Sequence, residues 1–206
     1  MMLVHGVAGY GKTTSCEQLC TQYGGISIRA QAFWSPSGML DALCEAFGVE
    51  ATSRPYRTVR VISNYLKRNP QPVVIDEIDH LFPKPLLLEG LRDIHDLTGN
   101  PIVLVGMAGA DRKVQRHPQL LRRITESVEL KPLDLADLKS IASVVCANTK
   151  IGDDLLKHIL DNAKGSTGLA VVGLSQIDKH LSGEKVADMK LWKETGASLF
   201  LGSRVA

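Results

Sequence analysis

The stretch MLVHGVAGYGKTT occupies Met2–Thr14 and carries the strongest structural signal in this chain of 206 residues. It opens with a short, mainly apolar run that is typical of a buried strand. The glycines that follow let backbone N–H groups turn inward around an anion, and a helix beginning behind them presents its positive end. The spacing Gly-x-x-x-x-Gly-Lys-Thr, from Gly6 to Thr13, therefore predicts a phosphate-binding loop between a strand and a helix.

The same motif assigns roles to single side chains. We expect Lys12 to reach the β- and γ-phosphates of a nucleotide and to assist catalysis, and Thr13 to hold Mg²⁺. The residues expected to bind the nucleotide are Gly6, Gly9, Tyr10, Gly11, Lys12, Thr13, Thr14 and Asp76. The alternative interpretation is a glycine-rich turn without a ligand.

A second run, Val73–Ile75, is wholly apolar and ends in two acids, Asp76 and Glu77. Such a run favours a strand buried on both faces, as in a parallel sheet. At its end Asp76 can join Thr13 as a Mg²⁺ ligand, and Glu77 can accept a proton from the attacking water as the catalytic base. An acidic strand end without function is the alternative. Because the chain lacks an Asn-Lys-x-Asp element, which reads guanine, we expect the nucleotide to be ATP.

Apolar strands alternate with amphipathic helices as far as residue 130, which predicts an α/β fold with a parallel sheet sandwiched by helices. The expected strands are Met2–His5, Ile26–Ala30, Val73–Ile75, Pro101–Gly106 and Glu126–Leu130. The expected helices are Ser15–Tyr23, 35–47, Arg54–Arg68, Leu86–Leu97 and Asp111–Arg116. From Pro132 onward we expect no strands and three helices, Asp134–Ala147, Asp153–Ala163 and Thr167–Leu181. The predicted domains are a core at 1–131, a small helical lid at 132–182 and a tail at 183–206 that holds one more helix and a loose end.

Composition limits the partners. The 24 Lys and Arg nearly balance the 22 Asp and Glu, giving a net charge of +2. Nucleic acid could therefore bind only through a local basic cluster. The four cysteines, Cys16, Cys20, Cys44 and Cys146, form no CxxC pair, so we expect buried thiols in a reducing, cytoplasmic setting. No apolar run reaches the length of about 20 residues that a membrane span needs, so we expect no membrane partner.

Taken together, the phosphate loop, the strand end Asp76–Asp79 and the helices of the lid resemble AAA+ ATPases of the P-loop NTPase fold. Over Met2–Leu181 the chain is similar more narrowly to the DNA-transposition ATPases of the phage Mu B, TniB and TnsC type. This narrower resemblance rests on Ile28–Ala30 before Ser35-Pro36, on Ile102–Gly106 and on Leu120–Ile124. It implies ATP and Mg²⁺ as cofactors, an ATP-dependent homo-oligomer, duplex DNA and a transposase as partners, and a role in target selection and transposase activation.

The resemblance also implies a catalytic arginine that acts on the neighbouring subunit's nucleotide, and Arg122 or Arg123 matches its place. A solvated basic turn is the alternative. Three departures lead us to expect weak, or oligomer- or DNA-dependent, hydrolysis. Only five residues precede Gly6, Met107 stands where a polar residue commonly senses the γ-phosphate, and Gly168-Leu169 lacks the arginine found in many relatives.

Two basic clusters are candidates for DNA contact. The first contains Arg112, Lys113 and Arg116, and the second contains Arg54, Arg57 and Arg60 at helical spacing. Contacts of this kind hold phosphates without reading sequence. A subunit interface and an exposed helix face are the respective alternatives. We expect Phe33 and Trp34 to pack beneath the following helix, with base stacking as the alternative.

Two other functions remain open. The chain could be an AAA+ regulator that acts on protein partners without DNA, which its near-neutral charge favours. It could also be a nucleotide-gated binding module with little hydrolysis, or a truncated remnant.

Overall fold

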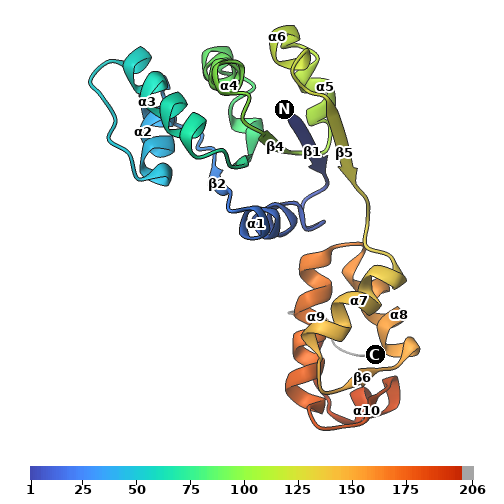
Figure 1. Cartoon of the computed structure of the whole chain (residues 1–206). Coiled ribbons are helices and arrows are strands. Elements are labelled where there is room, and N and C mark those ends of the chain that lie inside the picture. Colours follow the sequence, from blue (N-terminus) through green and yellow to red (C-terminus); the bar gives the residue numbers. More distant parts are fainter. Residues whose placement is uncertain (201–206) are drawn as a thin grey trace. The chain divides into compact units, whose positions relative to one another are not determined.

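The computed structural model describes residues 1–200 and contains a five-stranded parallel sheet. The strand order is β2-β3-β4-β1-β5, and Figure 1 shows the strands with the helices around them. The strands are β1 (Met2–Gly6), β2 (Ile26–Arg29), β3 (Val73–Asp76), β4 (Ile102–Met107) and β5 (Glu126–Leu130). The α/β fold with a parallel sheet flanked by helices is therefore confirmed.

The three central strands of the sheet, β3, β4 and β1, are buried on both faces because they are mainly apolar at successive positions. Side chains of neighbouring strand residues point to opposite faces. Accordingly Leu3 and Ile75 join the larger core, whereas Val4 and Val74 join a smaller core beneath helix α1 (Lys12–Tyr23). This double burial explains why the strands read as continuous apolar runs rather than as alternating ones.

The larger core lies under three long helices and two short ones. These are α2 (Pro36–Phe47), α3 (Pro55–Arg68), α4 (Pro85–Thr98), α5 (Ala110–Val114) and α6 (Pro118–Leu121). A 3₁₀ turn, η1 (Ile78–His80), follows β3. Neither η1 nor α6 is predicted from the sequence, since elements of three or four residues leave no periodic pattern.

Strand β1 lies at the point where the chain changes direction across the sheet. From β1 the chain moves to β2 at one margin, and from β4 it returns past β1 to β5 at the other. In open parallel sheets, ligands bind beyond the carboxyl ends of the strands at such a reversal. Gly6 ends β1 and Asp76 ends β3, so both lie at this edge.

Residues after β5 form a helical unit with its own core. Its helices are α7 (Leu135–Val145), α8 (Asp153–Ala163), α9 (Thr167–Leu181) and α10 (Met189–Glu194). Asp134 begins α7 with a capping box. Its side chain accepts a hydrogen bond from the Asp137 backbone N–H, and the Asp137 side chain accepts one from the Asp134 backbone N–H. Trp192 is fully buried in this core.

The expectation that strands cease after Pro132 is wrong. Two short parallel strands, β6 (Lys150–Ile151) and β7 (Val186–Ala187), pair with each other inside the helical unit. Each has only two residues, too few to show the period of two that identifies a strand in sequence.

The chain divides into two compact units, one made of Met1–Val7 and Lys12–Leu130 and the other of Ala8–Gly11 and Lys131–Ala206. The predicted tail contributes α10, while its last six residues, 201–206, lie outside the described residues. Among the helices that the structure describes, none has the length and apolarity required to cross a membrane.

The loop between β2 and α2 contains two aromatic residues with opposite environments. Trp34 is buried, as expected, but Phe33 is 99% exposed, so the expectation that Phe33 packs under α2 is wrong. Lys84 explains the difference, since its ammonium donates to the backbone carbonyls of Ala32 and Trp34 on either side. Those bonds fix the loop with Phe33 pointing outward.

Candidate active site

The phosphate loop has the backbone that its glycines predict. Gly9 and Gly11 have φ values of 84° and 82°, in the left-handed region that glycine tolerates best. Gly6 is required for a different reason, because a Cβ there would lie 2.8 Å from the carbonyl oxygen of Leu130 on β5. The loop therefore leaves β1 along a path that a side chain at Gly6 would block.

Lys12 begins α1 and is buried. Its Nζ donates to the carbonyl oxygens of Gly6 and Val7, each at 2.9 Å. An ammonium group has three donors, so a third remains after these two bonds. Backbone carbonyls of the loop thus hold a buried positive charge in place, and a bound phosphate group would supply the negative charge that such a cation needs.

Thr13 and Asp76 meet across the sheet edge, although they are 63 positions apart in the chain. The Thr13 hydroxyl donates to Asp76 Oδ2 at 2.7 Å. The other carboxylate oxygen, Oδ1, accepts from the backbone N–H of Glu77 at 2.7 Å. A hydroxyl oxygen and a carboxylate side by side are the hard oxygen ligands that Mg²⁺ prefers, so the pair fits the predicted metal role.

Glu77 has a strained backbone. Its φ of 55° places it in the left-handed region, and Lys164 is the other non-glycine residue there within residues 1–200. For an L-residue this conformation costs about 1–2 kcal/mol. The strain is maintained because Asp76 binds the Glu77 N–H and because η1 begins directly afterwards.

Arg29, at the end of β2, holds the Glu77 carboxylate. Arg29 pairs in register with Asp76, so its side chain starts one strand away from the two acids. Its Nη2 donates to Glu77 Oε1 at 3.0 Å. No role for Arg29 could be predicted from the sequence. Strand order is the missing information, since the paired residues Ile26 and Val73 are 47 positions apart in the chain yet adjacent in the sheet.

A second missed residue, Asp79 in η1, fixes the strand next to the acids. Its Oδ2 accepts from the backbone N–H of Met107 at 2.7 Å, and its Oδ1 lies 2.6 Å from Lys113 Nζ. Met107 ends β4, beside Gly6 in the register of β1. The thioether of Met107 cannot orient water as a polar side chain would. The backbone N–H of Met107, however, is held by the carboxylate of Asp79.

The two candidate trans-acting arginines differ in their environments. Arg123 forms a two-pronged ion pair with Asp96 on α4, at 3.1 and 2.9 Å, and Arg123 lowers the pKa of that carboxyl by hydrogen bonding. Arg122 is exposed and forms no ion pair within residues 1–200. Because Arg123 is already paired within its own subunit, Arg122 is the more available side chain.

The predicted DNA-contact residues lie on two separate helices. Arg112 and Lys113 are on α5, with Arg116 just beyond it. Lys113 is committed to Asp79, and it also lies 5.8 Å from the centre of the Phe82 ring. The other set is on or next to α3, where Arg54 is the N-cap and Arg57 and Arg60 are exposed.

The four cysteines are buried free thiols, as predicted. Cys16 lies on α1, and burial, assisted by the negative charge of Asp76, raises its pKa to about 11. A thiol with that pKa stays protonated at neutral pH, so Cys16 is a packing residue beside the site and not a nucleophile.

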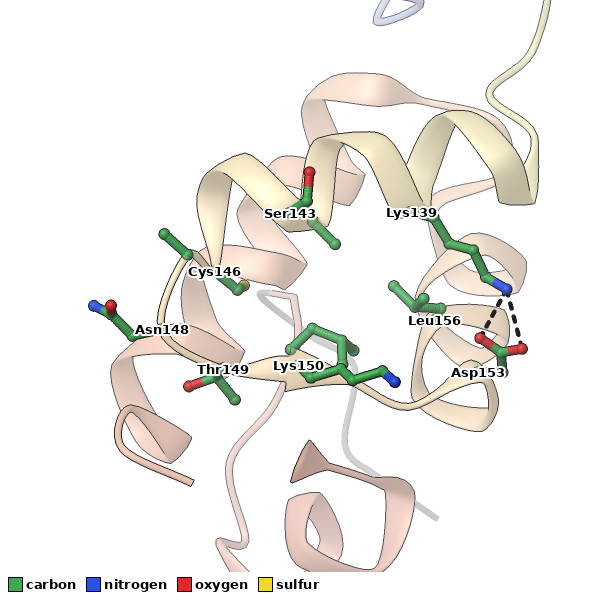
Figure 2. A pocket seen from close by; sticks show the side chains of 11 residues that line it. Lys139, Ser143, Cys146, Asn148, Thr149, Lys150, Asp153 and Leu156 are labelled. Carbon is green, nitrogen blue, oxygen red and sulfur yellow. Dashed lines mark hydrogen bonds and ion pairs between the residues drawn. The ribbon is translucent and has the colours of Figure 1, made fainter. Parts of the chain in front are cut away.

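A separate pocket lies within the helical unit. Figure 2 shows it between α7 and β6. Its volume is about 680 Å³. Its lining includes the apolar side chains of Ala142 and Leu156, and the ion pair between Lys139 and Asp153 lies among the lining residues. Burial raises the pKa of Cys146, which also lines the pocket, to about 11. None of the residues predicted to bind the nucleotide lines this pocket.

Comparison with known proteins gives one family match. Residues 1–114 match the family model described as "AAA domain". A curated Staphylococcus aureus protein described as "Potential ATP-binding protein" is 42% identical over 52 residues, which are 25% of this chain and 18% of that protein.

Several solved structures share the fold. The Aeropyrum pernix ORC2 protein with ADPNP and ADP matches with a TM-score of 0.71 at 17% identity, over 94% of this chain and 60% of its own. The Aeropyrum pernix ORC1 protein in complex with DNA matches with a TM-score of 0.58 at 19% identity, over 94% of this chain and 58% of its own. Cdc6p from Pyrobaculum aerophilum matches with a TM-score of 0.65 at 15% identity, over 90% and 57%. The chain thus spans about 60% of these structures' length and 18% of the curated relative.

Proposed function

The chain belongs to the AAA domain family, and from this premise we propose that it is an ATP-dependent, DNA-binding AAA+ ATPase. The observation that carries the proposal is the contact between Thr13 and Asp76, with Glu77 directly after it. Three residues from two distant parts of the chain meet at the carboxyl edge of the sheet, where the phosphate loop begins.

The residues have distinct roles in this proposal. The N–H groups of the glycine loop and the Lys12 ammonium bind the β- and γ-phosphates, and Thr13 and Asp76 hold Mg²⁺. When bound, Mg²⁺ neutralises negative charge on the phosphates. Glu77 accepts the proton of the attacking water, which it can do only when its carboxylate is directed toward that water. Arg29, whose side chain is 75% exposed, forms an ion pair with this carboxylate at 3.0 Å.

We also propose that ATP binding assembles the chain into a homo-oligomer on duplex DNA, and that hydrolysis releases it. In this proposal, Arg122 from one subunit stabilises charge on the γ-phosphoryl group bound to the next. The cellular role that best fits the sequence resemblance is DNA transposition, with target selection and activation of a transposase. The exposed arginines of α3 support the DNA part of the proposal.

The decisive experiment measures ATP hydrolysis by the purified chain with and without duplex DNA, at low and at moderate salt. We expect a DNA-stimulated rate that decreases with salt, since phosphate contacts weaken as counterions compete. Lys12→Ala should abolish hydrolysis through loss of phosphate binding. Glu77→Gln should retain ATP and DNA binding while hydrolysis decreases by about 100-fold or more, the usual contribution of a general base.

A second candidate is an AAA+ regulator that acts on a protein partner. The near-neutral net charge of +2 favours it. Hydrolysis that depends on Lys12 and Glu77 but is indifferent to DNA would support this candidate against the first. Absence of hydrolysis under all conditions, with ATP still bound, would instead indicate a nucleotide-gated binding module.

A further inference from the structure

Helix α3 has a distribution of charge unlike that of the other long helices in the sheet unit. Between Pro55 and Arg68 it contains two arginines in its first half and Lys67 and Arg68 in its last turn, and it has no Asp or Glu. Arg54 precedes it as the N-cap residue. All five of these basic residues are exposed. A protein with a net charge of only +2 thus concentrates five positive charges on one helix.

These charges lie along one face of the helix. Thr58, Ile62, Ser63 and Leu66 are buried and mark the opposite side. Successive positions 54, 57, 60, 64 and 68 differ by three or four residues, which places Arg54, Arg57, Arg60 and Arg68 on the exposed side together with the uncharged Asn64, and Lys67 is exposed beside them. At 1.5 Å per residue, the distance from Arg57 to Arg68 is about 16 Å along the axis. We call Arg54, Arg57, Arg60, Lys67 and Arg68 the α3 basic face.

The side chains of the α3 basic face have no acidic partner among residues 1–200, since none of the five forms an ion pair with a carboxylate. Other basic side chains of the same unit do: Arg92 and Arg123 pair with acids of α4, and Lys113 pairs with Asp79. The α3 basic face is therefore available to an external anion.

Helix stability does not explain the position of the first two arginines. Arg54 and Arg57 lie at the N-terminus of α3, where the helix dipole is positive and where acidic residues are stabilising. The first turn contains no acidic residue, and no side chain caps it. Positive charge at this end is unfavourable to the helix dipole, so these two arginines do not stabilise α3 in this way.

Tyr56 orients the arginines next to it. Its hydroxyl accepts a hydrogen bond from Arg57 Nε at 3.1 Å, and the Arg57 guanidinium lies 5.9 Å from the ring centre. Hydrogen bonds from Arg57 and then Arg54 lower the pKa of this exposed phenol. Contact with the ring leaves the guanidinium less free to move, which lowers the entropic cost of binding an anion.

We infer that the α3 basic face binds the sugar-phosphate backbone of duplex DNA, with Tyr56 positioning Arg57. The inference rests on the proposed function and names the surface through which DNA is held. DNA presents a phosphate every 3.4 Å per strand along its axis, so a face of about 16 Å spans several phosphates. The α5 cluster is the rival surface, but its Lys113 is already neutralised by Asp79. Because the contacts are to phosphates, the surface does not select a DNA sequence.

The test compares two matched variants of the full chain, Arg57→Ala/Arg60→Ala and Arg112→Ala/Arg116→Ala. Each removes two exposed arginines and the same net charge. Affinity for a short mixed-sequence duplex is measured with ATP present by fluorescence anisotropy over a series of salt concentrations, and circular dichroism checks the fold. The α3 variant should lose about tenfold or more in affinity, and its negative slope of log K against log salt should become shallower by about 1.8, or 0.9 for each lost contact. The α5 variant should change little.

Each remaining outcome is decisive. Unchanged affinity in the α3 variant, or a loss confined to the α5 variant, overturns the inference while leaving the proposed function intact. Equal losses in both variants also overturn it, because they indicate a response to net charge alone. If the unaltered chain does not bind the duplex in the presence of ATP, both the inference and the DNA part of the proposed function fail, whereas Lys12-dependent hydrolysis would still establish an ATPase.

Discussion

Glu77 is the residue in which stability and function oppose each other most directly. Its left-handed backbone, with φ of 55°, is one that glycine adopts without strain. We predict that Glu77→Gly is more stable than Glu77→Ala by about 0.5–1 kcal/mol, since relief of strain exceeds the extra chain entropy of glycine. Both variants lose the contact with Arg29 and the carboxylate of Glu77, so these losses do not contribute to the difference in stability between the two variants. Urea unfolding measures the stability of the two variants, and equal unfolding midpoints for Glu77→Gly and Glu77→Ala would show that the backbone at residue 77 is not strained.

Much of this site could be predicted at the level of single residues, but not all of it. Lys12, Thr13 and Asp76 follow from a motif and an acidic strand end, since both are local in sequence. Arg29 and Asp79 could not be assigned, because their partners Glu77 and Met107 are identified only once the strand order is known. The roles of the predicted residues in catalysis and DNA contact remain predictions.

At the scale of elements, Asp79 connects η1 to the end of β4 and to α5 through Met107 and Lys113. We predict that Asp79→Ala lowers the free energy of unfolding by about 1–3 kcal/mol, because the Met107 N–H loses its acceptor. Lys113→Ala should cost no more than about 1 kcal/mol, since its half-exposed ion pair is screened by solvent. Denaturant unfolding of the two variants tests the difference, and equal effects would mean that the ion pair and not the backbone bond is the important contact.

The elements themselves were predictable in proportion to their length. The three central strands and the long helices follow from apolar runs and helical spacing, because burial on both faces of the sheet leaves a continuous signal. The marginal strands β2 and β5 are only partly buried, and β2 shows an alternating pattern instead. The short elements η1, α6, β6 and β7 were missed. Each is stabilised by tertiary contacts rather than by its own sequence pattern, as the pairing of β6 with β7 shows.

At the scale of the whole molecule, the unpaired Arg122 leads to a prediction about assembly. If Arg122 acts on a neighbour's nucleotide, a working site needs Glu77 from one subunit and Arg122 from the next. Glu77→Gln and Arg122→Ala should each be nearly inactive alone, because a trans-acting arginine contributes about 10³-fold or more. Mixed in equal amounts, they should recover about one quarter of normal hydrolysis, since random head-to-tail pairing leaves that fraction of sites intact.

In the control mixture, the double variant Glu77→Gln/Arg122→Ala takes the place of the Arg122→Ala variant and is mixed in equal amounts with the Glu77→Gln variant. Every subunit then lacks Glu77, so no site is intact and hydrolysis should stay at background. Recovery in the first mixture and not in the second would show that the sites are shared between subunits. If Arg122→Ala alone keeps its activity while Arg123→Ala loses it, the ion pair of Arg123 with Asp96 must break on assembly, and the trans-acting residue is Arg123.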